Sequence, residues 1–532
     1  MGMTTDERAT DGESRAAPHA RSGILVRVFR SRAMVLMVVP LLAIALSGCV
    51  SADWQNRLFG KRHGSASPDD GLTAQGVATL KAKWRLPAPS CTAPPGSPPG
   101  AGAAGGEWFA TPVTFQGVIY IGSAHGCLFA INEATGTVKW KKFTAFQPVQ
   151  TCVQPLGVVS SVSVADDGHG NPLLYFHSSD GYLYKLKGSD GSQIWRSPVQ
   201  VPSATSNDVF AWSSPTVFNN KVIIGISSNC DTPFVQGQVR AYNATTGGLL
   251  WTHKTIPDGF VGAGDWYDAA VDTSGNVYVT TGSTTNQVAQ AHPNTSAGFE
   301  QYSLLKLNGT TGSLIWKAPA PQFANDPDYA SSPILFDGGG VALVGATNKD
   351  GWFRVYRQDN GNKVWQAFVG TPNADGGSSS LSGGVWNNSA LFVMGNATLT
   401  GGVWTHNGST CVESFPNCYA PVGGSSAAGA IRRLDPANGA LISVGGRPFE
   451  LALPSNPLAP CTLNGNSILV CAGGENPSTG HNRGLFVVDT TKAAAILRHL
   501  EDTVNAGEFG QPVQENAAIL SASDAALVKW GQ

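Results

Sequence analysis

Residues 117–140 read GVIYIGSAHGCLFAINEATGTVKW. The stretch holds three short apolar runs, separated by turns at His125-Gly126 and Ala134-Thr135-Gly136, and it ends at Trp140. Alternating apolar residues between glycine-containing turns are typical of half-buried β-strands joined as hairpins. The turn glycines fit positions where the backbone needs a positive φ. The segment therefore predicts consecutive strands of an antiparallel sheet.

The same order of strands and turns recurs along the chain. Six further copies occupy residues 173–195, 222–251, 276–316, 341–365, 391–442 and 468 onward. The closing tryptophans lie 55, 56, 65 and 49 residues apart, at Trp140, Trp195, Trp251, Trp316 and Trp365. A period of about 50 residues with four short strands per unit indicates a β-propeller. In such a ring, a large flat indole would fill the gap between neighbouring twisted sheets.

The two ends of the repeat region predict how the ring closes. Residues 79–84 look like the last strand of a unit that lacks its first three strands, and residues 517–530 look like the final strands of the chain. Pairing them would build one more sheet and would remove two exposed sheet edges. We expect an all-β fold of eight four-stranded antiparallel blades, with seven blades as the alternative.

The composition of the 532-residue chain agrees with an all-β protein. Charged residues make up 13%, half the usual ~25% of soluble proteins, whereas glycine and proline number 64 and 33. This balance disfavours an all-α protein and favours short strands with many tight turns. The net charge is −2 and no basic stripe stands out, so the sequence gives no reason to expect a nucleic-acid partner.

The N-terminal region has the features of a bacterial export signal. Arg27, Arg30 and Arg32 precede the apolar run Ala33–Leu46, which at 14 residues is short for a transmembrane helix. The run ends in Leu46-Ser47-Gly48-Cys49, which resembles the lipobox of bacterial lipoproteins. The resemblance implies that Cys49 is diacylated and becomes the first residue of the mature protein. A plain signal peptide, or a signal anchor with a chance cysteine, is the alternative.

These features predict three regions of the chain. Residues 1–48 form a lipoprotein signal peptide, residues 49–76 a flexible polar tether, and residues 77–532 a single propeller domain. The mature protein would be anchored by lipid to the cell membrane and would face the extracytoplasmic side.

The cysteines are consistent with export. Eight remain after the lipobox cysteine, and an even number in an oxidising compartment predicts disulfide bonds. The pairs Cys411–Cys418 and Cys461–Cys471 are close in sequence and are the expected bonds. No cysteine stands in a C-x-x-C-H motif, so no covalently attached haem is expected.

The repeat unit itself resembles the pyrroloquinoline quinone (PQQ) repeat, from about residue 78 to the end of the chain. Two functional classes share this repeat. One contains the quinoprotein alcohol dehydrogenases, including polyvinyl alcohol dehydrogenase. The other contains non-catalytic propellers, such as the lipoprotein of the outer-membrane β-barrel assembly machinery. The repeat therefore implies the fold, and the choice of function depends on the site residues.

Two segments resemble those that hold the cofactor and the catalytic base in the quinoproteins. Gly264-Asp265-Trp266-Tyr267-Asp268 resembles the segment whose tryptophan stacks under the quinone, which implies that Trp266 binds PQQ. Asp326–Pro333 resembles the D-x-D-[FY]-[AG]-x-x-P segment, which implies that Asp328 is the catalytic base. In this chemistry a carboxylate takes the alcohol proton while a hydride passes to the cofactor.

Two further segments resemble those that complete the site. Asn348–Gly351 resembles the segment that gives a lysine or arginine to the quinone oxygens, which implies this role for Lys349. Ser227–Asp231 resembles the segment that supplies an acidic calcium ligand, and Asp231 is its nearest carboxylate. The resemblance thus implies PQQ and Ca²⁺ as cofactors, with the metal ion acting as a Lewis acid.

The sequence departs from the family at several points. The family commonly ends the strand after the stacking tryptophan with Thr-Gly-Asn, whose asparagine binds calcium, whereas this chain has Thr281-Gly282-Ser283 followed by Asn286. The candidate metal ligands are therefore Asp231, Asn286 and Asp328. No two cysteines are neighbours, so the disulfide of the methanol and ethanol enzymes is absent and polyvinyl alcohol dehydrogenase-like propellers are the better comparison. Without a haem domain, the electron acceptor of an enzyme would be a separate protein.

Each candidate residue also has a purely structural interpretation. Trp266 could pack between blades, Asp328 could cap a turn, Lys349 could be exposed in a hairpin, and Asp231 could be an ordinary loop residue. The functional interpretation is favoured because the four segments fall in consecutive units, in the family's own order. The alternative function is a non-catalytic scaffold that binds an envelope protein partner.

The lipobox makes a direct prediction. A Cys49→Ala variant should lose lipidation and appear in the soluble fraction, because the acylated side chain is removed. Mass spectrometry and membrane fractionation measure both effects. Unchanged membrane retention together with an unchanged mass would contradict the lipobox assignment.

Overall fold

The computed structural model describes most of the chain after the apolar N-terminal region. The described residues are 52–105, 107–147, 156–200, 212–228, 231–321, 328–370, 383–395, 405–406, 409–410, 429–453, 459–473, 484–492, 495–501 and 510–532. All of them belong to one compact unit, Cys49–Gln532, which is separate from Met1–Gly48. Cys49, the predicted signal peptide and the predicted Cys411–Cys418 bond lie outside the described residues.

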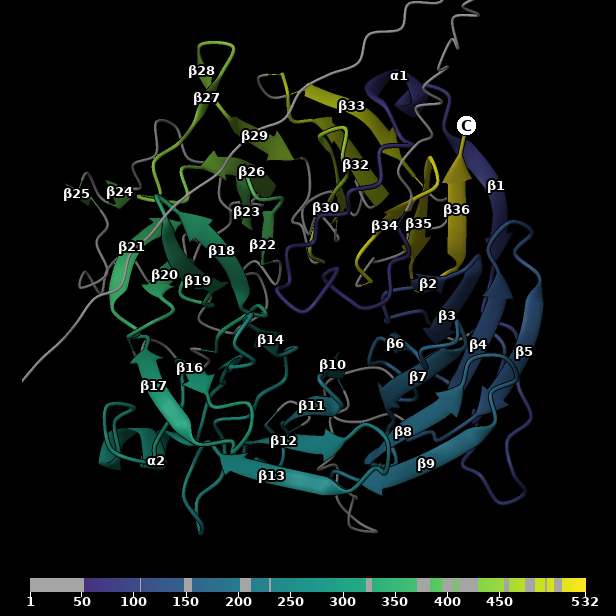
Figure 1. Ribbon diagram of the computed structural model, residues 1–532, viewed down its shortest axis with the longest axis horizontal. Helices are drawn as coiled ribbons and strands as arrows, with labels where there is room; N and C mark the ends of the chain where they lie inside the picture. The colour runs from purple at the N-terminus through teal and green to yellow at the C-terminus, as the bar shows by residue number, and fades with distance from the viewer. Residues whose placement is uncertain are drawn as a thin grey trace, which may run out of the picture. The chain divides into compact units, whose positions relative to one another are not determined.

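The described unit is a ring of eight four-stranded antiparallel sheets (Figure 1). The expected all-β, eight-bladed propeller is confirmed, and the seven-bladed alternative is wrong. In seven sheets the strands follow one another in chain order. The first strand of each of these seven sheets lies nearest the centre of the ring in Figure 1.

The first four blades are formed by residues 113–319. Their strands are β2 (Val113–Phe115), β3 (Val118–Gly122), β4 (Cys127–Asn132), β5 (Val138–Phe143), β6 (Ser163–Asp166), β7 (Pro172–His177), β8 (Tyr182–Lys187), β9 (Gln193–Pro198), β10 (Thr216–Phe218), β11 (Lys221–Ile226), β12 (Gln238–Asn243), β13 (Leu249–Lys254), β14 (Ala270–Val271), β15 (Val277–Thr280), β16 (Ser303–Leu307) and β17 (Leu314–Pro319).

The next three blades are formed by residues 334–500. Their strands are β18 (Ile334–Gly338), β19 (Val341–Thr347), β20 (Trp352–Arg357), β21 (Lys363–Phe368), β22 (Gly384–Trp386), β23 (Leu391–Gly395), β26 (Gly429–Leu434), β29 (Glu450–Leu453), β30 (Thr462–Leu463), β31 (Ile468–Gly473), β32 (Gly484–Asp489) and β33 (Ala495–Leu500). Two small ribbons, each of two strands, are inserted in the sixth blade: β24 (Thr405–His406) with β25 (Ser409–Thr410), and β27 (Ser443–Val444) with β28 (Arg447–Pro448).

The eighth blade joins the two ends of the repeat region. It contains β34 (Val513–Glu515), β35 (Ala518–Ala522), β36 (Leu527–Gly531) and, on the outside, β1 (Lys81–Leu86). Strands β1 and β36 are antiparallel, with Lys81 opposite Gly531 and Leu86 opposite Leu527. The predicted closure is confirmed, and the ring leaves no blade with a missing strand.

Neighbouring blades are held together by a tryptophan that packs on a glycine. An indole in the middle of the outer strand lies on the turn glycine of the next blade, in the pairs Trp84–Gly136, Trp140–Gly191, Trp195–Gly247, Trp251–Gly312, Trp316–Gly361 and Trp365–Gly439. A Cβ atom on these glycines would lie 2.5–2.9 Å from the ring. The indole Nε1 also donates a hydrogen bond of 2.8–3.3 Å to a backbone carbonyl beside the same turn. Glycine is therefore required at these positions for two reasons: the backbone has a positive φ, and the neighbouring indole leaves no room for a side chain.

The residues before the first strand differ from the expected flexible tether. Residues 53–69, here called the N-terminal strap, run inside the ring of sheets, where Figure 1 shows them in purple. Trp54 is fully buried. Strap carbonyls accept backbone hydrogen bonds of 2.7–3.0 Å from the innermost strands of six blades, donated by Thr114, Val164, Val271, Leu335, Trp386 and Leu463. The tether prediction is wrong for this segment because the inner sheet edges need hydrogen-bond partners, which the strap backbone supplies.

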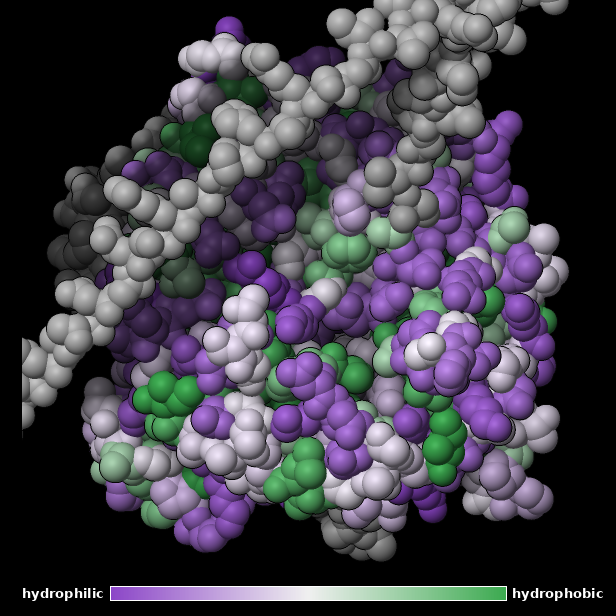
Figure 2. All heavy atoms as spheres, in the orientation of Figure 1, coloured by the Kyte–Doolittle hydropathy of each residue, from purple (hydrophilic) through white to green (hydrophobic). Residues whose placement is uncertain are grey.

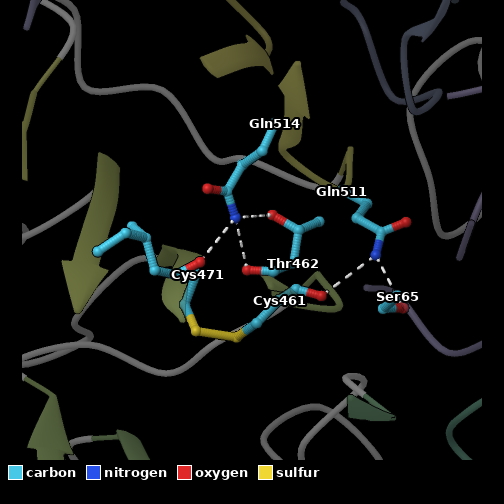
Figure 3. The surroundings of a disulfide bond; sticks show 7 residues. Ser65, Cys461, Thr462, Cys471, Gln511 and Gln514 are labelled. Atoms are coloured by element: carbon cyan, nitrogen blue, oxygen red, sulfur yellow. Dashed lines mark hydrogen bonds between the residues drawn. A yellow bond between two sulfur atoms is a disulfide. The ribbon is translucent and has the colours of Figure 1, made fainter. Parts of the chain in front are cut away.

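Two disulfide bonds are present among the described residues. Cys461–Cys471 is confirmed, and it lies where the strap passes the seventh blade (Figure 3). There Gln511 donates to the Ser65 hydroxyl of the strap at 3.0 Å and to the Cys461 carbonyl at 3.2 Å. The second bond, Cys91–Cys127, was not expected from the sequence. It fixes the proline- and glycine-rich loop before β2 to strand β4.

Helices are few in the described part of the chain. The two α-helices are α1 (Ala74–Val77), which follows the strap, and α2 (Asn286–Ala291), which is inserted in the fourth blade. Within the described ranges, the helices lack the length and apolar content needed to cross a membrane.

The tryptophan–glycine contact predicts a measurable cost of substitution. Gly312→Ala should destabilise the propeller by about 1–3 kcal/mol more than Gly259→Ala, because only the first new methyl group would overlap an indole. Both glycines have a positive φ, of 74° and 86°, so the backbone strain is shared. Denaturant unfolding of the two variants measures the difference, and equal losses of stability would contradict the proposed role of the contact.

Candidate functional site

The propeller topology brings the four predicted site segments to one end of the ring. In an up-and-down four-stranded blade, the loop after the second strand and the loop before the first strand lie at the same end. Asp231 and Lys349 follow second strands, β11 and β19, whereas Trp266 and Asp328 precede first strands, β14 and β18. The four residues therefore come from three consecutive blades and share one face.

Lys349 and Asp328 form a buried ion pair at this end. The Lys349 Nζ lies 3.0 Å from Asp328 Oδ2, and the two side chains are only 8% and 11% exposed. The Lys349 backbone N–H also donates to the Asp328 carbonyl at 2.9 Å. These two contacts fix the lysine against the segment that carries the carboxylate.

Trp266 also contacts this ammonium group. The Lys349 Nζ is 5.3 Å from the centroid of the half-buried indole, within the range of a cation–π interaction. The predicted stacking residue, cation and base thus form one connected group. A flat ligand that rests on the indole would meet the ammonium and the carboxylate together.

Asp231 belongs to the same cluster. Its carboxylate accepts hydrogen bonds of 2.9 Å from Ser228 Oγ and from Ser283 Oγ. Burial raises the pKa of Asp231, and the nearby negative charge of Asp328 raises this pKa further, while the two serines and Lys349 oppose the shift. A cation between the two carboxylates would relieve their repulsion.

Asn286 is not brought to this cluster. It is the exposed first residue of α2, which is capped by Thr285 through a hydrogen bond to the Val288 N–H. The helix begins immediately after residue 285, so the asparagine turns towards solvent, and Ser283 lies beside Asp231 instead. Sequence reasoning considered Ser283 only as the residue that replaces the family asparagine.

Several buried polar atoms around the cluster have no hydrogen-bond partner in the described part of the chain. They are Asp328 Oδ1, the Trp266 Nε1 and Ser227 Oγ, and the buried carboxyl of Asp265 lies close by, beside the backbone N–H of Tyr267. Unsatisfied buried groups are rare in folded proteins and are costly, so several in one place indicate a ligand site. The free carboxylate oxygen, the indole face and the lysine fit the needs of a planar quinone.

The oxygen ligands for a metal ion are fewer than calcium usually requires. Across the described ranges, no three His, Cys, Asp or Glu side chains gather in a way that could hold a metal ion. Asp231 and Asp328 supply two carboxylates, and Ser283 supplies a hydroxyl. Because Ca²⁺ takes six to eight oxygen ligands, the remaining positions would be filled by water or by a bound cofactor.

Asp265 was not predicted as a site residue, although it directly precedes Trp266. Its side chain is fully buried, and the burial, together with the neighbouring Asp268, raises its pKa well above the usual value. The sequence offered one sign of this residue: a carboxylate directly before Trp266, in a segment expected to be buried. A carboxylate is costly to bury, so its presence there could have indicated a special role.

The fold and this group of side chains define a quinoprotein dehydrogenase-like propeller. The chain belongs to the PQQ family described as "Glucose/ethanol/alcohol dehydrogenase, beta-propeller domain", whose family model matches residues 54–369. The family resemblance inferred from the repeats is confirmed.

Sequence relatives include both functional classes. The chain is 26% identical to quinoprotein glucose dehydrogenase of Escherichia coli, over 60% of this chain and 44% of that protein. It is 25% identical to polyvinylalcohol dehydrogenase of a Pseudomonas species, over 61% and 52%. It is 27% identical to outer membrane protein assembly factor BamB of Burkholderia pseudomallei, over 49% and 56%. The chain thus spans about half the length of these relatives.

A solved structure agrees with the architecture. Quinohemoprotein alcohol dehydrogenase from Comamonas testosteroni superposes with a TM-score of 0.64 and 16% sequence identity, over 90% of this chain and 81% of that chain. At this identity the likeness shows the fold alone.

The burial of Asp265 predicts a pH-dependent stability. An unfolded aspartate loses its proton near pH 4, whereas the folded protein holds this proton to higher pH, so its contribution to stability falls as the pH rises above about 4. Asp265→Asn removes this cost. The stability of the variant relative to the wild type should therefore increase from about pH 4 towards neutral pH, by up to about 1.4 kcal/mol per pH unit.

The measurement is thermal or denaturant unfolding of both proteins over this pH range. Asp359→Asn is the control, because Asp359 lies in an exposed turn and should show no such increase. A difference between Asp265→Asn and the wild type that does not change with pH would contradict the assignment.

Proposed function

We propose that the protein is a PQQ- and calcium-dependent alcohol dehydrogenase of the polyvinyl alcohol dehydrogenase type. The observation that carries the proposal is the Lys349 ammonium, which lies over the Trp266 indole and pairs with Asp328. The second carboxylate oxygen of Asp328, which has no hydrogen-bond partner among the described residues, supports the same proposal. The reaction needs a flat surface for the cofactor, a cation beside the cofactor oxygens and a base, and Trp266, Lys349 and Asp328 would supply them.

Each side chain has a distinct task in the proposed reaction. PQQ, when bound, supplies the electrophilic carbonyl that receives the hydride of the alcohol. Trp266 gives the flat surface that orients the ring, and Lys349 places a positive charge beside its oxygens. Asp328 accepts the hydroxyl proton at Oδ1, since Oδ2 is already held by Lys349.

Asp231, Asp328 and Ser283 are the residues that would hold the calcium ion. Asp231 and Asp328 contribute negative charge, and Ser283 contributes a hydroxyl oxygen beside Asp231. Hard cations prefer such oxygen ligands. Oxidation of an alcohol releases two electrons, and we propose that a separate protein would be their final acceptor. We further propose that the lipid on Cys49 keeps the enzyme at the extracytoplasmic face of the cell membrane.

A scaffold that binds an envelope protein is the second candidate, because BamB is among the relatives. The surface gives this candidate little support. In the part of Figure 2 that grey atoms leave visible, hydrophobic residues are scattered among hydrophilic ones. The exposed large apolar side chains of the described residues fall mostly on outer strands of several blades, as at Ile194, Leu249, Leu314, Val364 and Ile496.

Reconstitution separates the two candidates. The purified protein is incubated with PQQ and Ca²⁺, and the absorption of the quinone and the reduction of a dye by primary and secondary alcohols are measured. The enzyme should bind the quinone and reduce the dye. If the protein neither changes the quinone spectrum nor oxidises any alcohol, the enzyme proposal is excluded and the scaffold function remains.

Removal of the proposed base gives the sharpest test of the chemistry. Asp328→Asn should lower the rate of dye reduction by about 10²–10⁴-fold, the usual effect of losing a general base. Because Asp328 also pairs with the buried Lys349, unfolding and quinone binding of the variant are measured alongside its rate, and the comparison is made at saturating quinone and Ca²⁺. The matched control is Asp359→Asn, an exposed carboxylate of the same blade as Lys349. An Asp328→Asn enzyme with wild-type rates would exclude Asp328 as the base.

A further inference from the structure

We propose that Arg57 of the N-terminal strap is a positioning residue for Trp266, acting through the neighbouring residues Tyr267 and Asp268. This inference rests on the proposed function, because it explains how the cofactor surface of that site is held in place. The inference gives a role to the strap, which lies outside the repeats and was expected from the sequence to be a flexible tether.

The first link is the contact between Arg57 and the residues after Trp266. Arg57 Nη1 lies 3.0 Å from Asp268 Oδ2, and the side chains are 10% and 2% exposed. The guanidinium carbon is also 5.8 Å from the centroid of the Tyr267 ring. Both contacts are shielded from water, so they are screened far less than surface ion pairs.

The second link runs from Tyr267 to the cofactor surface. The rings of Trp266 and Tyr267 are 4.3 Å apart between centroids. Lys349 approaches the same indole at 5.3 Å. The indole is therefore one member of a row of contacts that begins at the strap guanidinium and ends at the ion pair of the site.

Asp268 connects this row to two neighbouring blades. Its Oδ1 accepts the Ser214 N–H at 2.7 Å, and its own N–H donates to Ser332 Oγ at 3.1 Å. Arg57 supplies the cationic partner of this buried carboxylate. Loss of that partner would leave a buried charge uncompensated, which drives local rearrangement.

The strap also contacts the segment that carries Asp328. The His63 Nδ1 lies 3.0 Å from the Pro333 carbonyl, and the Arg62 carbonyl accepts the Leu335 N–H at 3.0 Å. Burial lowers the pKa of His63 to about 4, so the ring is neutral at neutral pH and its Nδ1–H donates this bond. One segment thus supports both the indole and the segment of the proposed base.

A small cavity adjoins the Arg57 side chain. It lies between the strap and the site segments and is lined in part by Arg57, His63, Tyr267 and Ser332. A shorter or uncharged side chain at residue 57 would enlarge this space on the Tyr267 side. Tyr267, and with it Trp266, would then lose a fixed position.

The test compares Arg57→Met with Arg62→Met. Both residues are strap arginines that pair with an aspartate, but Arg62 pairs with the exposed Asp337 in strand β18. The proteins are labelled with 5-fluorotryptophan, and the Trp266 resonance is assigned by its loss in Trp266→Phe. The proposal expects this resonance to shift or broaden in Arg57→Met and to stay unchanged in Arg62→Met.

Titration with PQQ in the presence of Ca²⁺ gives the second readout. Arg57→Met should bind the quinone about tenfold more weakly, which equals about 1.4 kcal/mol. Arg57→Lys, which keeps the charge, should recover part of the loss. Gly312→Ala is the control for stability, because it weakens the contact between two blades at an outer turn. It should bind the quinone normally. The comparison thus distinguishes a general loss of stability from a displaced indole.

The outcomes separate the two proposals. An unchanged Trp266 resonance in folded Arg57→Met would overturn the positioning role, whatever the protein binds. A wild type that fails to bind PQQ would remove the proposed function, while the resonance would still decide the role of Arg57. If Arg57→Met does not fold, Arg57→Lys takes its place in both measurements, and a wild-type resonance together with wild-type affinity would then overturn the proposal.

Discussion

The packing of an indole on a turn glycine is the contact that fixes one blade against the next. It combines a van der Waals surface, a hydrogen bond from Nε1 and a backbone conformation that glycine adopts without strain. Six such pairs are present from Trp84 to Gly439. Because each pair sets the rotation between two sheets, the ring geometry follows from a local rule that is repeated around the axis. The site exists only because this rule brings loops of three blades together.

Closing the ring creates a second constraint at its centre. The innermost strands present N–H and C=O groups that no neighbouring strand can pair, and buried backbone groups without partners are costly. The strap meets this need with its own carbonyl groups. The strap is an irregular segment with turns over residues 56–63, and it leaves carbonyl groups available that a helix would use internally. Its side chains are thereby placed directly behind the site, where Arg57 and His63 contact the segments of Trp266 and Asp328.

The sequence predicted what is periodic and missed what is not. The strands, the closing tryptophans and the β1–β36 pairing repeat a pattern, and the site segments stand at fixed places within it. The strap has no period, because its carbonyl groups pair with the inner strands through the backbone, which any residue can supply. The Cys91–Cys127 bond joins a loop to a strand 36 residues away, a distance that spacing does not favour. Asn286 lies outside the cluster because Thr285 begins a helix there.

A propeller of this family can act as an enzyme or as a scaffold, and the repeats are the same in both. The difference lies in polar groups that fold stability does not require. A scaffold gains nothing from a fully buried carboxyl group such as that of Asp265, from the Trp266 N–H without an acceptor, or from a half-satisfied Asp328. Each lowers stability, and all lie in segments that adjoin the Lys349 ion pair. A ligand that uses these groups would offset their cost, which is why the cluster favours chemistry over a purely structural role.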